Sequence, residues 1–85
     1  MVEMVKRRSD LEISADVLRI AKDGAKKSHI VFRANLNFKI VEGYLMQLQE
    51  TGLITFSSDG NRLFTTTAKG EEYLTQYTKL VKQFQ

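Results

Sequence analysis

Cysteine, proline and tryptophan are all absent from this chain of 85 residues. Without cysteine neither a disulfide nor a thiolate metal site can form, and the composition fits a reducing compartment. Without proline, the helix ends must be set by glycine, asparagine and side-chain caps. No apolar run approaches the ~18 residues of a membrane span. We therefore expect a soluble, cytoplasmic protein with no membrane partner.

Acidic charge is also somewhat scarce, because 13 Lys and Arg residues stand against 10 Asp and Glu, for a net charge of +3. This small excess is compatible with a nucleic-acid partner without demanding one. The length predicts one small domain, which buries only about 60–65% of its unfolded surface. Association with a second copy is the expected source of further stability.

Periodicity and turn signals predict the order helix, helix, helix, hairpin, helix. The expected helices cover residues 9–23, 28–34, 38–50 and 68–85, with β-prone segments over 53–57 and 62–66. Ser9 and Glu12 form a capping box, and Ser28 and Thr67 are the expected N-caps of the second and fourth helices. Gly24 and Asn35 suit left-handed positions after helices. The predicted fold class is α+β, mostly helical: a winged helix-turn-helix with three core helices, a two-stranded wing and a C-terminal helix.

Helix phase separates the expected core from the expected outer surface. On the third helix Phe38, Val41, Tyr44, Leu45 and Leu48 share one side and predict its buried face. Phe32 and Phe38, beside Leu36 and Ile40, are also expected in the core, with base stacking as the alternative. The last helix carries an apolar stripe whose outer part would be exposed in a monomer, which favours a homodimer. The predicted dimerisation residues are Tyr73, Tyr77, Leu80, Val81 and Phe84.

The chain resembles a family of small archaeal winged-helix DNA-binding proteins and predicted transcriptional regulators. The resemblance lies in the first-helix start (residues 7–13), in Lys27–Phe38, in Tyr44-Leu45 with Leu48, in Gly52-Leu53-Ile54 and in Thr67-Ala68-Lys69-Gly70. Asn37, Gly43 and Thr66 depart from the family's usual residues. The resemblance implies DNA binding, no catalysis and, in some relatives, dimerisation through a longer last helix. We expect the chain to divide into a basic N-terminal arm (1–8), a winged helix-turn-helix domain (9–67) and a C-terminal helix (68–85) that serves as the dimerisation element.

Cations near phosphates would supply the general grip on DNA. They lie at the start of the second helix, on the third helix, beside the hairpin tip and in the N-terminal arm. The alternative for each is a solvated surface charge, and the fold favours a functional role most for Lys39 and Arg62. The outer side of the third helix would read bases, with Lys39 donating to guanine and Glu42 accepting from cytosine. The predicted DNA-binding residues are Lys6, Arg7, Arg8, Lys26, Lys27, Ser28, His29, Asn37, Lys39, Glu42, Gly43, Gln47, Asn61 and Arg62.

Two residues in this set have competing explanations. Gly43 in mid-helix costs about 1 kcal/mol relative to Ala, which suggests either close approach of the backbone to DNA or a tight helix contact. His29 is the only histidine and has no second ligand at metal spacing, so we expect no metal and no other cofactor. No small-molecule ligand is evident either.

The sequence thus predicts a dimeric, nucleoid-associated protein that binds double-stranded DNA and regulates transcription. Three alternatives remain open: a winged helix that docks to proteins, a nonspecific DNA-compacting protein, and a binder of RNA or single strands. The apparent burial of the aromatic residues disfavours the last one.

Overall fold

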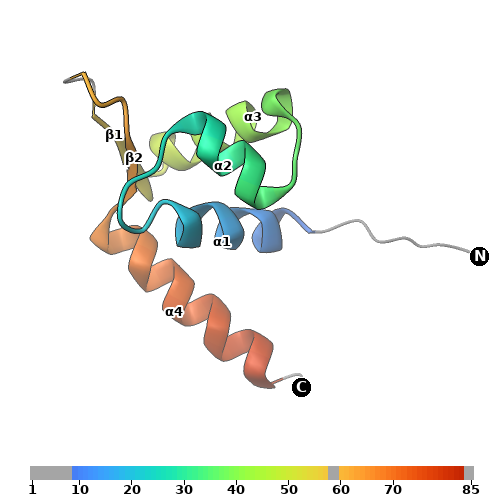
Figure 1. Ribbon diagram of the computed structural model, residues 1–85. Helices are drawn as coiled ribbons and strands as arrows, with labels where there is room; N and C mark the ends of the chain where they lie inside the picture. Colours follow the sequence, from blue (N-terminus) through green and yellow to red (C-terminus); the bar gives the residue numbers. More distant parts are fainter. Residues whose placement is uncertain (1–8, 58–59, 84–85) are drawn as a thin grey trace, which may run out of the picture.

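The computed structural model describes residues 9–57 and 60–83, and this part of the chain forms four helices and one antiparallel hairpin, arranged as in Figure 1. The elements are α1 (Asp10–Ile20), α2 (Lys27–Ala34), α3 (Phe38–Glu50), β1 (Ile54–Phe56), β2 (Phe64–Thr66) and α4 (Ala68–Gln83). Their order is the predicted one, which confirms the winged helix-turn-helix architecture. No helix of the described part has both the length and the apolar character needed to cross a bilayer.

Side-chain caps set two of the helix starts, the first at Ser9 as predicted and the second at Asn37, which was not predicted as a cap. The hydroxyl of Ser9 accepts a hydrogen bond from the backbone N–H of Glu12 at 3.1 Å, and Asn37 Oδ1 accepts from the N–H of Ile40 at 2.8 Å. Each cap satisfies a backbone donor that the helix itself leaves free. Asn35 adopts a left-handed conformation (φ 57°) after α2, which turns the chain toward α3.

Two predicted helix boundaries are wrong. α1 ends at Ile20 rather than near residue 23, and residues 21–23 form a turn. α2 begins at Lys27, one residue early, so Lys26 is its N-cap and makes no side-chain cap. Ser28 therefore lies inside the first turn of α2 and does not cap it.

The core lies where α1, α2 and α3 meet under the hairpin. Its largest fully buried side chains come from all three helices: Leu18, Ile30, Leu45, Val17 and Val41. Ile54 of β1 and Phe64 of β2 close it on the hairpin side. α1 lies between α2 and α4 in Figure 1, so α3 and the hairpin project on one side of it and α4 on the other.

The Thr67–Gly70 segment attaches α4 to the chain before β1. Thr67 donates its hydroxyl to the carbonyl of Gly52 at 2.7 Å and accepts from the N–H of Gly70 at 3.1 Å, which confirms it as the cap of α4. Lys69 Nζ donates to the carbonyl of Thr51 at 3.0 Å. Gly70 is buried, and a Cβ there would collide with the carbonyl oxygen of Leu53. The segment thus fixes α4 against the loop between α3 and β1.

The predicted burial of two aromatic residues is wrong. Phe32 is 80% exposed and Phe38 is 52% exposed, and Ile40 beside them is exposed too. Phe32 lies two residues from both Ile30 and Ala34, which form the buried side of α2, so helical geometry turns it outward. Phe38 begins α3, where no preceding turn covers it. The reason for disfavouring single-strand binding therefore no longer holds.

α4 finishes the core with its first half and leaves part of its stripe uncovered. Tyr73 and Leu74 pack against the core, and the hydroxyl of Tyr73 donates to the carbonyl of Leu11 at 3.2 Å. Burial raises the pKa of Tyr73, and the neighbouring Tyr77 adds to that effect. Leu80 is 54% exposed.

Candidate nucleic-acid interface

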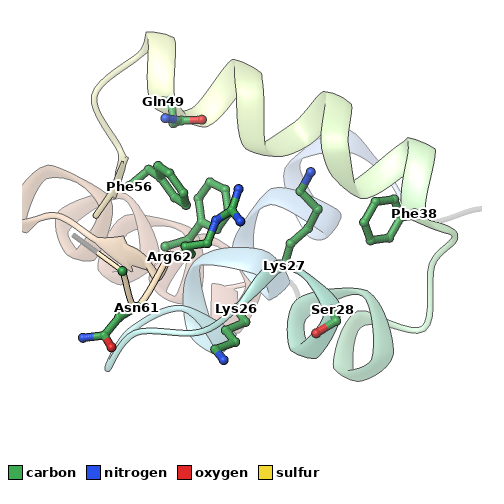
Figure 2. Close-up of a pocket in the computed structure, with 10 residues that line it drawn as sticks. Lys26, Lys27, Ser28, Phe38, Gln49, Phe56, Asn61 and Arg62 are labelled. Atoms are coloured by element: carbon green, nitrogen blue, oxygen red, sulfur yellow. The ribbon is translucent and has the colours of Figure 1, made fainter. Parts of the chain in front are cut away.

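A groove of about 520 Å³ opens between the start of α2, one side of α3 and the hairpin (Figure 2). Three consecutive elements meet there, because the turns at Asn35 and Thr51-Gly52 bring α3 and the hairpin back across α2. The lining mixes cations, amides and aromatic rings: Lys26, Lys27, Ser28, Phe38, Gln49, Phe56, Gly60, Asn61, Arg62 and Phe64.

Lys27 reaches from α2 toward α3 (Figure 2). Its Nζ donates to Glu42 Oε2 at 3.0 Å and lies 5.0 Å from the centre of the Phe38 ring. A cation over an aromatic face is attracted by the ring quadrupole. The side chain of Lys27 is 32% exposed and that of Glu42 is 53% exposed, so solvent or a ligand can reach both.

Arg62 extends into the groove from the hairpin, near Phe56 (Figure 2). Its φ of 55° is left-handed, a region that residues other than Gly, Asn and Asp seldom adopt. Behind it, Phe56 and Phe64 pack their rings with centroids 4.7 Å apart. Lys26 and Asn61 also line the groove, but their side chains point away from α3 in Figure 2.

The outer side of α3 is exposed, as predicted. Lys39, Gly43 and Gln47 all lie on it, together with Met46 and Glu50. Lys39 is the only basic residue of α3. A Cβ at Gly43 would meet no atom within 4 Å, so no contact inside the described part of the chain requires this glycine. Asn37 differs from the others because its side-chain oxygen is engaged in the cap of α3.

The predicted site residues thus fall into separate places. Lys27 and Arg62 face one groove, whereas His29 lines a neighbouring depression with Phe32 and Leu63. Lys6, Arg7 and Arg8 lie outside the described residues, as does Phe84. Within residues 9–57 and 60–83 no cluster of His, Cys, Asp or Glu could hold a metal ion.

Sequence reasoning missed four side chains of the groove, namely Phe38, Gln49, Phe56 and Phe64. Phe38 and Gln49 are three helical turns apart and therefore lie on the same side of α3. This spacing predicts that Phe38 and Gln49 lie together in the groove once that side of α3 is known to face the hairpin. Nothing in the sequence distinguished Phe56 from an ordinary buried strand residue.

Comparison with protein-family models decides the family. A model described as winged helix-turn-helix matches residues 7–84. The chain belongs to this family. The match runs through α4, so the C-terminal helix is part of the family's unit. No protein with a curated description matches the chain by sequence.

Solved structures from several organisms share the fold. Sso10a-2, a DNA-binding protein from Sulfolobus solfataricus, is 25% identical with a TM-score of 0.81, over 88% of this chain and 80% of that one. BpsR of Bordetella bronchiseptica, whose DNA binding is regulated by 6-hydroxynicotinic acid, is 20% identical with a TM-score of 0.75, over 84% of this chain and 55% of its own. A MarR-family regulator from Neisseria meningitidis is 23% identical with a TM-score of 0.67, over 85% and 54%. The chain thus spans about half the length of the two bacterial proteins.

Proposed function

We propose that this protein binds double-stranded DNA and regulates transcription, with α3 in the major groove and the hairpin against the adjacent backbone or minor groove. The observation that carries this proposal is the placement of Lys27, Lys39 and Arg62. They come from α2, α3 and the hairpin, and all lie on or beside the side of the molecule where α3 is uncovered. No catalytic step belongs to the proposal.

The geometry of α3 supports insertion into DNA. Its buried side holds Val41, Leu45 and Leu48 against the core, which leaves the opposite side free along the whole helix. The major groove of B-DNA is about 12 Å wide and admits one α-helix. Lys39 near the start of α3 would then reach base edges or phosphates, and Arg62 would neutralise the neighbouring backbone.

The comparisons add support from outside the chain. Sso10a-2 is a DNA-binding protein, and its identity and TM-score make it a relevant guide to this fold. BpsR also binds DNA, although its identity of 20% makes it a guide to the fold alone.

The proposal includes a homodimer formed through α4. Leu80 is a large apolar side chain left 54% exposed one turn beyond Tyr77 on the same stripe. Burying such a side chain contributes about 1.5–3 kcal/mol, which a second copy of α4 would provide. A two-fold dimer would also place two copies of α3 on two half-sites of an operator.

The test is a titration of fluorescent duplex DNA at two salt concentrations with the wild type, Lys39→Ala, Arg62→Ala and Lys79→Ala. Lys79 is the matched control, because it is an exposed lysine on α4, away from the groove. Each of the first two variants should reduce the slope of log K against log salt by about 0.9 per lost phosphate contact. Lys79→Ala should leave it unchanged.

Two results would contradict the proposal. Absence of duplex binding at low salt would favour a protein-docking winged helix. Tighter binding of single strands than of duplexes would favour base stacking on the exposed Phe32 and Phe38. Equal micromolar binding to every duplex would instead reduce the function to nonspecific DNA compaction.

A further inference from the structure

Glu42 is out of place on a surface that binds DNA. It lies one turn after Phe38 on α3, and Gln49 follows two turns later on the same side, so it faces the groove edge that these two residues line. A carboxylate there opposes every approaching phosphate. Yet its side chain is 53% exposed, so the fold does not hide the charge.

The contact with Lys27 adds to the unfavourable effect of Glu42 on an approaching phosphate. Lys27 is a groove cation with its Nζ already 3.0 Å from Glu42 Oε2, and the two charges cancel. The Phe38 ring holds the ammonium from the other side at 5.0 Å. A phosphate that contacts Lys27 either displaces Glu42 or brings a second anion against the same ammonium group, and both have an electrostatic cost. Exposed ion pairs are weak, so this exchange is accessible but not free of cost.

The cost of freeing Lys27 from Glu42 is the same for every DNA sequence, unless a base donates a hydrogen bond to the Glu42 carboxylate. The N4 amino group of cytosine, in the major groove, is the donor that Glu side chains accept from. A penalty imposed on all competitors, and relieved at one target, is how binding sites gain specificity.

From these contacts we infer that Glu42 is a specificity-determining residue: it withholds Lys27 from phosphates on duplexes in general and is compensated where a cytosine amino group faces it. This inference rests on the proposed function, because it assigns a role to Glu42 within the proposed α3–DNA contact. In the free protein Lys27 is paired with Glu42, and in the complex it contacts a phosphate.

The experiment begins with selection of preferred sequences from a random duplex pool by the wild type. Dissociation constants for a selected site and its scrambled version are then measured for the wild type, Glu42→Ala, Glu50→Ala, Lys27→Ala and Lys27→Ala/Glu42→Ala. Glu50 is the matched control, since it is an exposed acid on the same helix with no ion pair among the described residues. Alanine is used because glutamine at position 42 would itself read adenine.

Glu42→Ala should bind the scrambled duplex more tightly, with a salt slope steeper by about 0.9 as Lys27 becomes available. The ratio of the two dissociation constants should fall roughly fivefold or more, because one good base contact discriminates by at least that factor. Glu50→Ala should leave the ratio unchanged. In the Lys27→Ala background, removing Glu42 should not steepen the salt slope.

The inference is overturned if Glu42→Ala and Glu50→Ala behave alike, or if the slope still steepens without Lys27. It is also overturned if the wild type binds duplexes but selects no sequence, a result that leaves DNA binding itself intact. Failure of the wild type to bind any duplex at low salt refutes the proposed function instead, and the inference with it.

Discussion

Replacing Gly43 by alanine should stabilise the protein. Gly43 is an exposed residue in the middle of α3, and a Cβ there would meet no atom within 4 Å. The substitution therefore introduces no collision, and the helix gains the difference in propensity between Gly and Ala, about 0.8–1.0 kcal/mol. For a domain of this size, 1 kcal/mol corresponds to a rise in Tm of about 4–8 °C.

The matched comparison is the same chemical change at Gly70 of α4. A Cβ at that position would collide with the backbone carbonyl of Leu53 and with Cγ2 of Thr66. Because one of the obstacles is backbone, the surroundings cannot adjust by a simple rotamer change. Gly70→Ala should destabilise the fold by about 1–3 kcal/mol or more, a change opposite in sign to that of Gly43→Ala.

Thermal unfolding followed by circular dichroism measures both effects, and a DNA titration adds a functional readout. An unchanged or lowered Tm for Gly43→Ala would refute the description of α3 as an unobstructed helix at that point. If α3 brings its backbone close to DNA, the stabilised variant should nevertheless bind duplexes more weakly. Affinity equal to the wild type would refute close approach as the reason for this glycine.

Three further substitutions separate binding, packing and association. Arg62→Gly removes both a groove cation and a left-handed non-glycine residue (φ 55°). Tm should stay level or rise slightly, while the salt slope of DNA binding falls by about 0.9. A marked drop in Tm would contradict backbone strain at Arg62. Thr66→Val removes the buried hydrogen bond from Thr66 to the Leu18 carbonyl at 2.6 Å; urea denaturation should show a loss of about 1–3 kcal/mol, and an unchanged midpoint would mean that the carbonyl finds another donor. Leu80→Glu should shift sedimentation toward monomer with little change in the domain's own unfolding, because Leu80 is exposed in the single chain; a profile like that of the wild type would exclude α4 as the dimer contact.

The helix boundaries show which signals in the sequence are local. The prediction for α3 matches the structure residue for residue, since Asn37 caps its start and Thr51-Gly52 ends it. The end of α1 was placed too late because Ala21, Lys22 and Asp23 are compatible with a helix. In the structure the N–H of Thr66 donates to the carbonyl of Ala21 at 3.0 Å. That competing partner lies 45 positions away, and no local pattern reveals it.

The aromatic residues show a different kind of error. Phe32 was assigned to the core from its helical spacing to Leu36 and Ile40, although its phase relative to Ile30 and Ala34 already pointed outward. Phase alone would have corrected Phe32. It would not have revealed the Lys27–Glu42 pair, because the two residues are separated by 15 positions and meet only after the turn between α2 and α3. The sequence was therefore enough to predict which helices and which hairpin contribute residues to the groove. The structure was needed to show which of these residues contact each other.

The distribution of charge assigns different tasks to the parts of the proposed interface. α3 carries one cation, Lys39, and two acids, Glu42 and Glu50, so its net charge is +1 − 2 = −1. A helix with that balance does not enter a polyanionic groove through its own charge. The attraction must come from the cations that flank it on α2 and the hairpin, among them Lys26 and Arg62. Changes to those flanking residues should therefore alter the affinity for all sequences alike, whereas Glu42→Ala on α3 should alter the discrimination between sequences.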